Sequence, residues 1–199
     1  MTRDWRAIGL CLMSGMLTAT PAPASEPTPE IDACALLDAR AIRDVLGLSV
    51  EKGDRRDSGL ESNGAYSSSC VWLLSADRAR PADPGAPLGG KRFVILNALR
   101  WPQGSDGART YLQAFREASE SGVIESKPIA RPLGDEALWW GDGLAVRRGA
   151  VSFGVSVFVP PAAAATASPA GEREERLAKV ILARLAAQDV ARGGAIPAR

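Results

Sequence analysis

The sequence predicts an α+β domain: an antiparallel sheet of about five strands, with helices packed on one face. Three observations support this class. Segment 151–159 alternates between large apolar and small residues, with the period of two that a strand requires. Asp142-Gly143 and Arg148-Gly149 place tight turns before it, and strands joined by tight turns pair antiparallel. Segments 106–118 and 168–185 have the apolar spacing of amphipathic helices. The predicted order is α-β-β-α-β-β-β-α.

The first half of the domain is predicted to contain one short helix and two strands. Asp38 is a suitable N-terminal cap for the helix, and Gly47 is suited to end it in a left-handed turn. The strands are 70–74 and 91–100, and the second is expected to be central because both of its faces are apolar. The polar segment 52–69 and the proline-containing segment 78–90 are expected to be loops.

The second half starts with the clearest helix, for which Asp106 is placed as the cap. The apolar stripe of this helix is formed by Ala108, Tyr111, Leu112, Phe115 and Ala118. Three strands follow at 138–140, 144–147 and 151–159. One face of the last strand is expected to be buried and the other to be small and polar. An alanine-rich linker then leads to a final helix that begins at Ser168 and Pro169.

The first two dozen residues have the layout of a cleaved secretory signal. Arg3 and Arg6 give a positive start, 7–17 is nearly all apolar, and Ala22-Pro23-Ala24 is a small-x-small cleavage site. The apolar run is far shorter than the roughly 20 residues that span a bilayer. We therefore expect a periplasmic or secreted protein, soluble after signal cleavage and without a transmembrane anchor.

This processing defines the expected domain organisation. The signal peptide is 1–24, and a disordered leader follows at 25–31. A single α+β domain covers 32–190, and 191–199 form a flexible tail. Removal of the signal leaves equal numbers of basic and acidic residues. A neutral chain gains little from counterion release, so nucleic acid is not an expected partner.

Cys34 and Cys70 are the two cysteines that remain after signal cleavage, and export places them in an oxidising compartment. We expect them to form a structural disulfide, worth about 4 kcal/mol in the chain-entropy model. A metal site or a reactive thiol is the alternative. Such a site would need a nearby histidine or a second cysteine in C-x-x-C spacing, and the sequence has neither.

The chain contains no histidine, which removes the commonest general base, the Ser-His-Asp and Cys-His sites and His-ligated zinc. Segment 85–91 has the spacing of a phosphate-binding loop, but Arg92 replaces the hydroxyl that Mg²⁺ needs, and a strand follows instead of a helix. Asp135 and Glu136 are adjacent on an extended segment, so their side chains diverge. We therefore expect no enzyme, no cofactor and no metal.

Exposed aromatic residues are the remaining candidates for binding. Trp139 and Trp140 are consecutive, so on a strand only one of them faces the core. An exposed Trp140 near Arg147-Arg148, with Trp101 at the end of the central strand, would anchor a protein or sugar partner. We take Trp101, Trp140 and Arg147 as the candidate binding surface. The alternative is that a tryptophan lies over the second face of the sheet and shields it.

Several short motifs together resemble a family of bacterial exported domains of unknown function. The motifs are D-x-C-x-L-L at 32–37, L-G at 46–47, C-x-W at 70–72, and the later segments 133–137 and 144–149. The resemblance implies an α+β fold with a disulfide between the two cysteines, and it implies no activity. Members are often lipoproteins, but this chain lacks a lipobox, because Cys11 lies inside the apolar run after the bulky Leu10.

These observations predict an exported, non-enzymatic binding or accessory protein of the bacterial cell envelope, whose partner is an envelope protein or a small ligand. One alternative is an inhibitor or immunity-type protein that blocks a partner enzyme. Another is a hydrolase without histidine, which would need two carboxylates about 5–10 Å apart in one cleft.

Overall fold

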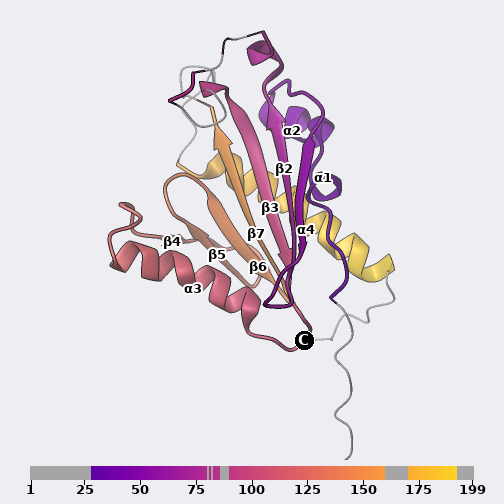
Figure 1. Cartoon of the computed structure of the whole chain (residues 1–199), viewed down its shortest axis with the longest axis vertical. Helices are drawn as coiled ribbons and strands as arrows, with labels where there is room; N and C mark the ends of the chain where they lie inside the picture. The colour runs from indigo at the N-terminus through magenta and orange to yellow at the C-terminus, as the bar shows by residue number, and fades with distance from the viewer. Residues whose placement is uncertain (1–27, 80, 82, 86–89, 160–169, 192–199) are drawn as a thin grey trace, which may run out of the picture.

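The computed structural model describes residues 28–79, 81, 83–85, 90–159 and 170–191. The predicted signal peptide, the start of the leader, the alanine-rich linker with the predicted start of the last helix, and the tail from 192 lie outside these residues. The described residues form the α+β protein that the sequence predicts, built on one antiparallel sheet (Figure 1).

The sheet has seven strands, where the sequence predicts about five. They are β1 (Asp54–Leu60), β2 (Tyr66–Leu73), β3 (Phe93–Arg100), β4 (Ile129–Ala130), β5 (Glu136–Trp139), β6 (Leu144–Arg148) and β7 (Val151–Phe158). Their order across the sheet is β1-β2-β3-β7-β6-β5-β4. The sheet therefore consists of two meanders that meet where β3 pairs with β7.

The two strands that the sequence did not predict, β1 and β4, are the edges of the sheet. β1 lies in the polar segment 52–69, which we expected to be a loop, and its side chains are almost all exposed. It is a strand because its backbone pairs with β2, and its charged side chains form ion pairs with one another. β4 is too short for any apolar period.

The predicted first helix is α2 (Ala39–Leu46), and a short helix that the sequence did not predict, α1 (Ala33–Leu36), precedes it. Each helix begins at an aspartate, because Asp32 and Asp38 both accept a hydrogen bond from a backbone N–H of the first turn. Gly47 ends α2 with a φ of +68°. The cap at Asp38 and the left-handed turn at Gly47 confirm the predicted boundaries of α2.

The long helices are α3 (Gly107–Glu120) and α4 (Glu172–Ala191). α3 starts where it was predicted, but Asp106 forms no capping hydrogen bond, and its carboxylate lies 3.4 Å from Arg109 instead. The predicted apolar stripe of α4 is buried at Leu177, Ile181 and Leu185.

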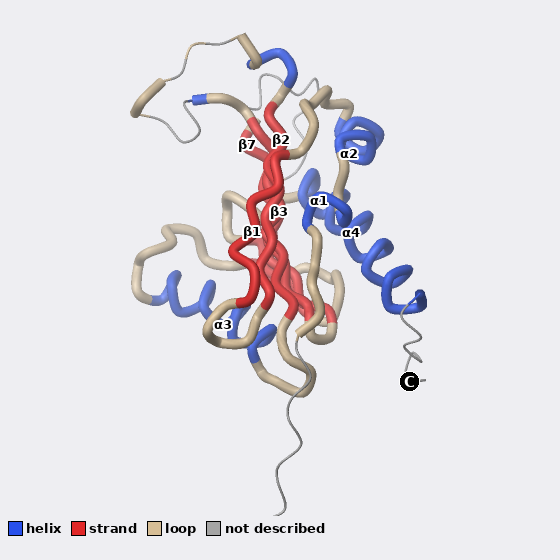
Figure 2. Tube along the Cα trace, turned by 45° about the vertical axis from the view of Figure 1, so that its right-hand side comes forward, coloured by secondary structure: helices blue, strands red, loops and turns tan. Residues whose placement is uncertain are grey.

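The helices cover both faces of the sheet, which corrects the prediction that they lie on one face (Figure 2). α1, α2 and α4 lie on one face, the α4 face. α3 lies on the other, the α3 face, over β5, β6 and β7. β6 contributes Leu144 and Val146 to the α4 side and Ala145 to the α3 side. Both faces need a cover because the central strands carry apolar or small residues on each side.

The main core lies between the sheet and α4 and contains large side chains such as Trp72, Phe153 and Leu96. Ile31, which we placed in the leader, is only 2 % exposed and belongs to this core, so ordered structure begins before Asp32. The predicted small, polar face of β7 is also buried, since Ser152 and Ser156 lie on the α3 side and are almost inaccessible.

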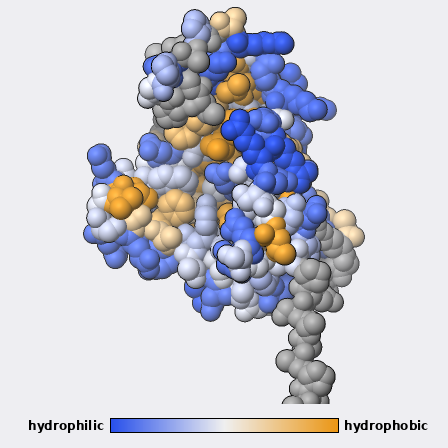
Figure 3. Space-filling model, viewed as in Figure 1, coloured by the Kyte–Doolittle hydropathy of each residue, from blue (hydrophilic) through white to orange (hydrophobic). Residues whose placement is uncertain are grey.

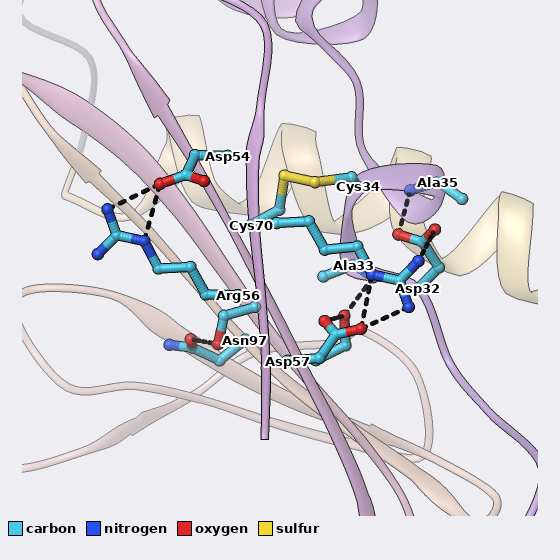
Figure 4. The surroundings of a disulfide bond; sticks show 12 residues. Asp32, Ala33, Cys34, Ala35, Asp54, Arg56, Asp57, Cys70 and Asn97 are labelled. Carbon is cyan, nitrogen blue, oxygen red and sulfur yellow. Dashed lines mark hydrogen bonds and ion pairs between the residues drawn. A yellow bond between two sulfur atoms is a disulfide. The ribbon is translucent and has the colours of Figure 1, made fainter. Parts of the chain in front are cut away.

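The predicted disulfide joins Cys34 of α1 to Cys70 of β2, with their Cα atoms 5.2 Å apart (Figure 4). A polar network lies beside it. The Ser68 hydroxyl donates to Asp57 over 2.6 Å and accepts a hydrogen bond from the Ala33 N–H over 3.0 Å. The disulfide and this network together attach α1 to the β1–β2 edge.

Candidate functional site

Trp101 follows β3 and is partly exposed, but its ring positions the start of α3. The indole Nε1 donates a hydrogen bond to the Ser152 hydroxyl over 2.8 Å. The ring lies against Gly107, where no Cβ would fit. Trp101 therefore connects β7 to α3, which makes a structural role sufficient to explain it.

Trp140 follows β5 and lies on the α3 face. Its ring stacks on that of Phe115 from α3, with the ring centroids 4.6 Å apart. The Cζ2 and Cη2 edge of the ring lies against Gly143, which leaves no room for a Cβ there. This is the shielding position that we gave as the alternative for a tryptophan beside the second face of the sheet.

Arg147 and Arg148 point to opposite faces of the sheet. Arg147 lies 3.2 Å from Asp135 and 3.7 Å from Glu136. Arg148 donates a hydrogen bond to the Leu182 carbonyl of α4 over 2.7 Å. The two arginines therefore form no joint cationic patch, and Asp135 and Glu136 are both neutralised by ion pairs.

The three predicted binding residues do not form one surface. Arg147 lies opposite Ser152 in the β6–β7 pair, so it borders the hydroxyl to which Trp101 donates. Trp140 lies at the other end of β6, beside Gly143. Trp101, Trp140 and Arg147 all lie at the border of the contact between α3 and the sheet. The surface next to this contact is the better candidate for binding.

α3 covers only part of its face of the sheet. It packs on β5, β6 and β7. Of the outward side chains of β2 and β3, Val71 and Phe93 are buried and the others stay partly exposed. We call this region the open sheet face and define it by Ser67, Ser69, Leu73, Ile95, Asn97 and Leu99. Figure 3 shows apolar surface over the middle of the sheet, between α3 and the hydrophilic side chains over β1.

A row of polar groups crosses the open sheet face. Arg56, Ser69, Asn97 and Gly154 lie opposite one another on β1, β2, β3 and β7. The Ser69 hydroxyl donates to Asn97 Oδ1 over 2.7 Å. Within the described part of the chain, the Asn97 amide nitrogen donates no hydrogen bond. Figure 4 shows Arg56 and Asn97 on one side of β1 and the disulfide on the other.

Tyr111 of α3 extends this row. A Cβ built on Gly154 would lie 2.9 Å from the Tyr111 oxygen, so the hydroxyl occupies the place of the missing side chain. It is therefore the neighbour of Asn97 across the β3–β7 pair, where facing Cβ atoms are about 5 Å apart. Among the described residues, the Tyr111 hydroxyl has no hydrogen-bond partner. Burial raises the pKa of Tyr111 to about 12.

These groups are suited to binding and poorly suited to proton transfer. The Asn97 amide and the hydroxyls of Ser69 and Tyr111 offer donors and acceptors without a charge. Because its pKa is so high, Tyr111 stays protonated at neutral pH and is not a base. Ile95 and Leu99 stand on either side of Asn97 on β3, so apolar surface borders the polar row.

The described residues lack two further features. They contain no group of three Cys, Asp or Glu side chains placed to hold a metal ion. None of their helices combines the length and the apolar character that crossing a membrane requires.

Comparisons with protein-family models, with curated proteins and with solved structures gave no significant match. Function is therefore inferred from the chemistry of the open sheet face.

The sequence contained one signal for this site that we did not use. Asn97 is the only polar residue between Phe93 and Leu99 in an otherwise apolar strand. An amide in such a position needs hydrogen-bond partners, which makes it a candidate for a site. Tyr111 gave no comparable signal, because an apolar stripe on a helix accounts for it equally well.

Proposed function

We propose that this chain is an exported, non-enzymatic binding protein of the bacterial cell envelope and that its ligand lies on the open sheet face. One observation carries the proposal. Asn97 pairs with Gly154, whose missing side chain the Tyr111 hydroxyl replaces, and neither the Asn97 amide nitrogen nor this hydroxyl has a hydrogen-bond partner in the described part of the chain. Because both groups reach the surface without a partner in the described fold, they are available to hydrogen-bond a ligand.

Export is supported by the sequence of the first two dozen residues and by the Cys34–Cys70 disulfide. A disulfide of this kind persists in oxidising compartments, and the layout of 1–24 is that of a signal peptide. The resemblance to exported bacterial domains also favours export.

The binding role is supported by the kind of groups that the site offers. Hydroxyls and a carboxamide hold a ligand by hydrogen bonds, and neither type titrates near neutral pH. The chain has no histidine, and Asp135 and Glu136 are engaged by Arg147. These properties favour binding over catalysis.

The test maps contact between the mature protein and a soluble extract of the native envelope. Amide shifts of ¹⁵N-labelled protein are recorded with and without the extract. We expect changes concentrated on β2, β3 and the Tyr111 turn of α3, and their loss in Asn97→Ala. The control Asn63→Ala removes an exposed amide of the β1–β2 turn, outside the six residues that define the face, and should leave the response intact. Unchanged spectra, or changes confined to other surfaces, would contradict the proposal.

A further inference from the structure

The geometry points to a short, uncharged oligosaccharide as the ligand of the open sheet face. This inference rests on the proposed binding function and adds the chemical class of the ligand. Three properties of the face lead to it: its size, its lack of net charge and the arrangement of its hydrogen-bonding groups.

The face is too small for a stable protein partner. The uncovered part of β3 runs from Ile95 to Leu99, because Phe93 is buried, and with a rise of about 3.4 Å per residue its length is about 17 Å. The uncovered width is taken as two to three strand spacings, which is about 10–15 Å. The resulting area of roughly 200–250 Å² is well below the roughly 800 Å² per partner of a standard protein interface. This argues against a second copy of the chain and against an inhibitor that uses this face alone.

The face has no net charge to recognise an ionic ligand. Its six defining side chains are hydroxyl, amide and aliphatic groups. The charged pair at its β1 border, Arg56 and Asp54, is internally neutralised at 2.7 Å. A phosphate or carboxylate ligand would lose its hydration shell here without gaining an unpaired cation, so an uncharged ligand is favoured.

The polar groups also disfavour a purely apolar ligand. A lipid chain or an apolar helix laid across Asn97 and Tyr111 would leave both groups desolvated and unpaired. Each such group costs about 1–3 kcal/mol. The ligand must therefore bring hydrogen-bonding groups to the centre of the face.

A sugar chain meets both requirements. Its hydroxyls both donate and accept, so one of them is able to take a hydrogen bond from the Asn97 amide and to pair with the Tyr111 hydroxyl. Its C–H surfaces are apolar and suit Ile95 and Leu99 on either side of Asn97. The edge of Trp140 lies near Gly154 at the border of the same row, within 3.7 Å of a Cβ built there, and offers aromatic surface.

The test is a titration of the full mature protein with neutral oligosaccharides that differ in linkage, namely chito-, cello- and maltohexaose. Binding is followed by amide shifts and by tryptophan fluorescence. We expect at least one of the three to bind and to shift the amides of Ser69, Asn97 and Gly154. Absence of binding by all three at millimolar concentration overturns the inference.

Two tyrosine variants provide a matched pair, because the chain has only two tyrosines and they lie on opposite faces. Tyr111→Phe removes only the hydroxyl from the site and should weaken binding about tenfold. Tyr66→Phe makes the same chemical change on the α4 side and should leave binding unchanged. Equal affinities for the two variants would contradict the inference, even if a sugar binds. Thermal unfolding of each variant verifies that it is folded.

The outcomes separate this inference from the proposed function. If envelope extract shifts the open sheet face and no oligosaccharide does so, the binding function stands and the assignment of a neutral sugar is wrong. If neither the extract nor the sugars act on this face, both are wrong.

Discussion

Glu174 in the first turn of α4 is a carboxylate whose surroundings disfavour its charge. It is 2 % exposed, and its Oε1 accepts a hydrogen bond from the Val157 N–H over 3.2 Å. The pairing of β7 with β6 ends at Val155, so the Val157 N–H has no partner on β6. The Glu174 side chain accepts this hydrogen bond in place of a β6 carbonyl. Burial raises the pKa of Glu174, and the hydrogen bonds and the nearby Arg173 only partly oppose this.

We expect Glu174→Gln to stabilise the protein at neutral pH. The pKa is higher in the folded state than the 4.5 of an unfolded glutamate, so folding favours the protonated form. Stability from this group is fully present below pH 4.5 and is lost as the pH rises through the folded pKa. Glutamine keeps the Oε1 acceptor without the charge, so the free energy of unfolding should rise by about 1 kcal/mol at pH 7 and change little at pH 4. Urea denaturation at both pH values measures this difference.

Glu172→Gln is the control, because this partly exposed residue lies in the same turn and loses the same charge. It should change stability by less than about 0.5 kcal/mol at either pH. A Glu174→Gln variant that is less stable than the parent at pH 7 would show that the ionised form is favoured after all.

At the scale of elements, the disulfide is the covalent link between α1 and β2. We expect Cys34→Ala/Cys70→Ala to lower the free energy of unfolding by about 4 kcal/mol, because the unfolded chain regains the entropy of the open loop. Urea denaturation of the oxidised protein and of the variant measures the loss. Reductant should destabilise the parent and leave the variant unchanged. A parent that is insensitive to reductant would contradict the expectation.

The β2–β3 connection depends on a second link, between Asp77 and Arg92. Asp77 is 3 % exposed and accepts hydrogen bonds from the backbone N–H, the Nε and a terminal nitrogen of Arg92, all within 2.9 Å. Asp77→Ala leaves these donors without their acceptor and should destabilise the protein by about 2–3 kcal/mol. Asp77→Asn keeps one acceptor oxygen, so its loss should be smaller. Thermal unfolding ranks the two variants, and equal midpoints for both and for the parent would refute this role.

The accuracy of the sequence predictions differs from element to element for physical reasons. β7, β3 and α3 were predicted because burial imposes a clear period on their side chains. β1 was not predicted, because an exposed edge strand is specified by the backbone of its neighbour and its own side chains are free to be polar. The burial of both faces of β7 could not be predicted either, since serine and glycine fit a solvated face and a tightly covered face equally well.

The candidate site was predicted only in its general region. Trp101, Trp140 and Arg147 do lie around the α3 side of the sheet, but each one is engaged by a neighbour in the fold. Asn97 and Tyr111 become adjacent only through the β3–β7 pairing and the crossover of α3. Such long-range pairing is not visible in local sequence patterns.

For the whole molecule, the localisation proposal makes a prediction about processing. When the full chain is produced in a bacterial host, we expect the protein outside the cytoplasm to start at Ser25, with its two cysteines oxidised. Ala24→Asp places a charge at the cleavage site and should leave the precursor uncleaved. Intact-mass spectrometry with thiol labelling measures both properties.

A chain that lacks residues 1–24 is the control for this experiment, and it should stay inside the cell with two free thiols. A full chain that stays inside the cell, uncleaved and with both thiols reduced, would overturn the proposed localisation.

The meeting of the two meanders at β3 and β7 also has a consequence for how fast the chain folds. The contacts within each half are close in sequence, so each half forms after short loop closures. The central pair joins segments separated by α3 and three strands, and this long closure must be completed before its contacts contribute. The folding rate is therefore determined mainly by residues of β3 and β7 in the middle of the sheet. Residues in the edge strands mainly affect the unfolding rate.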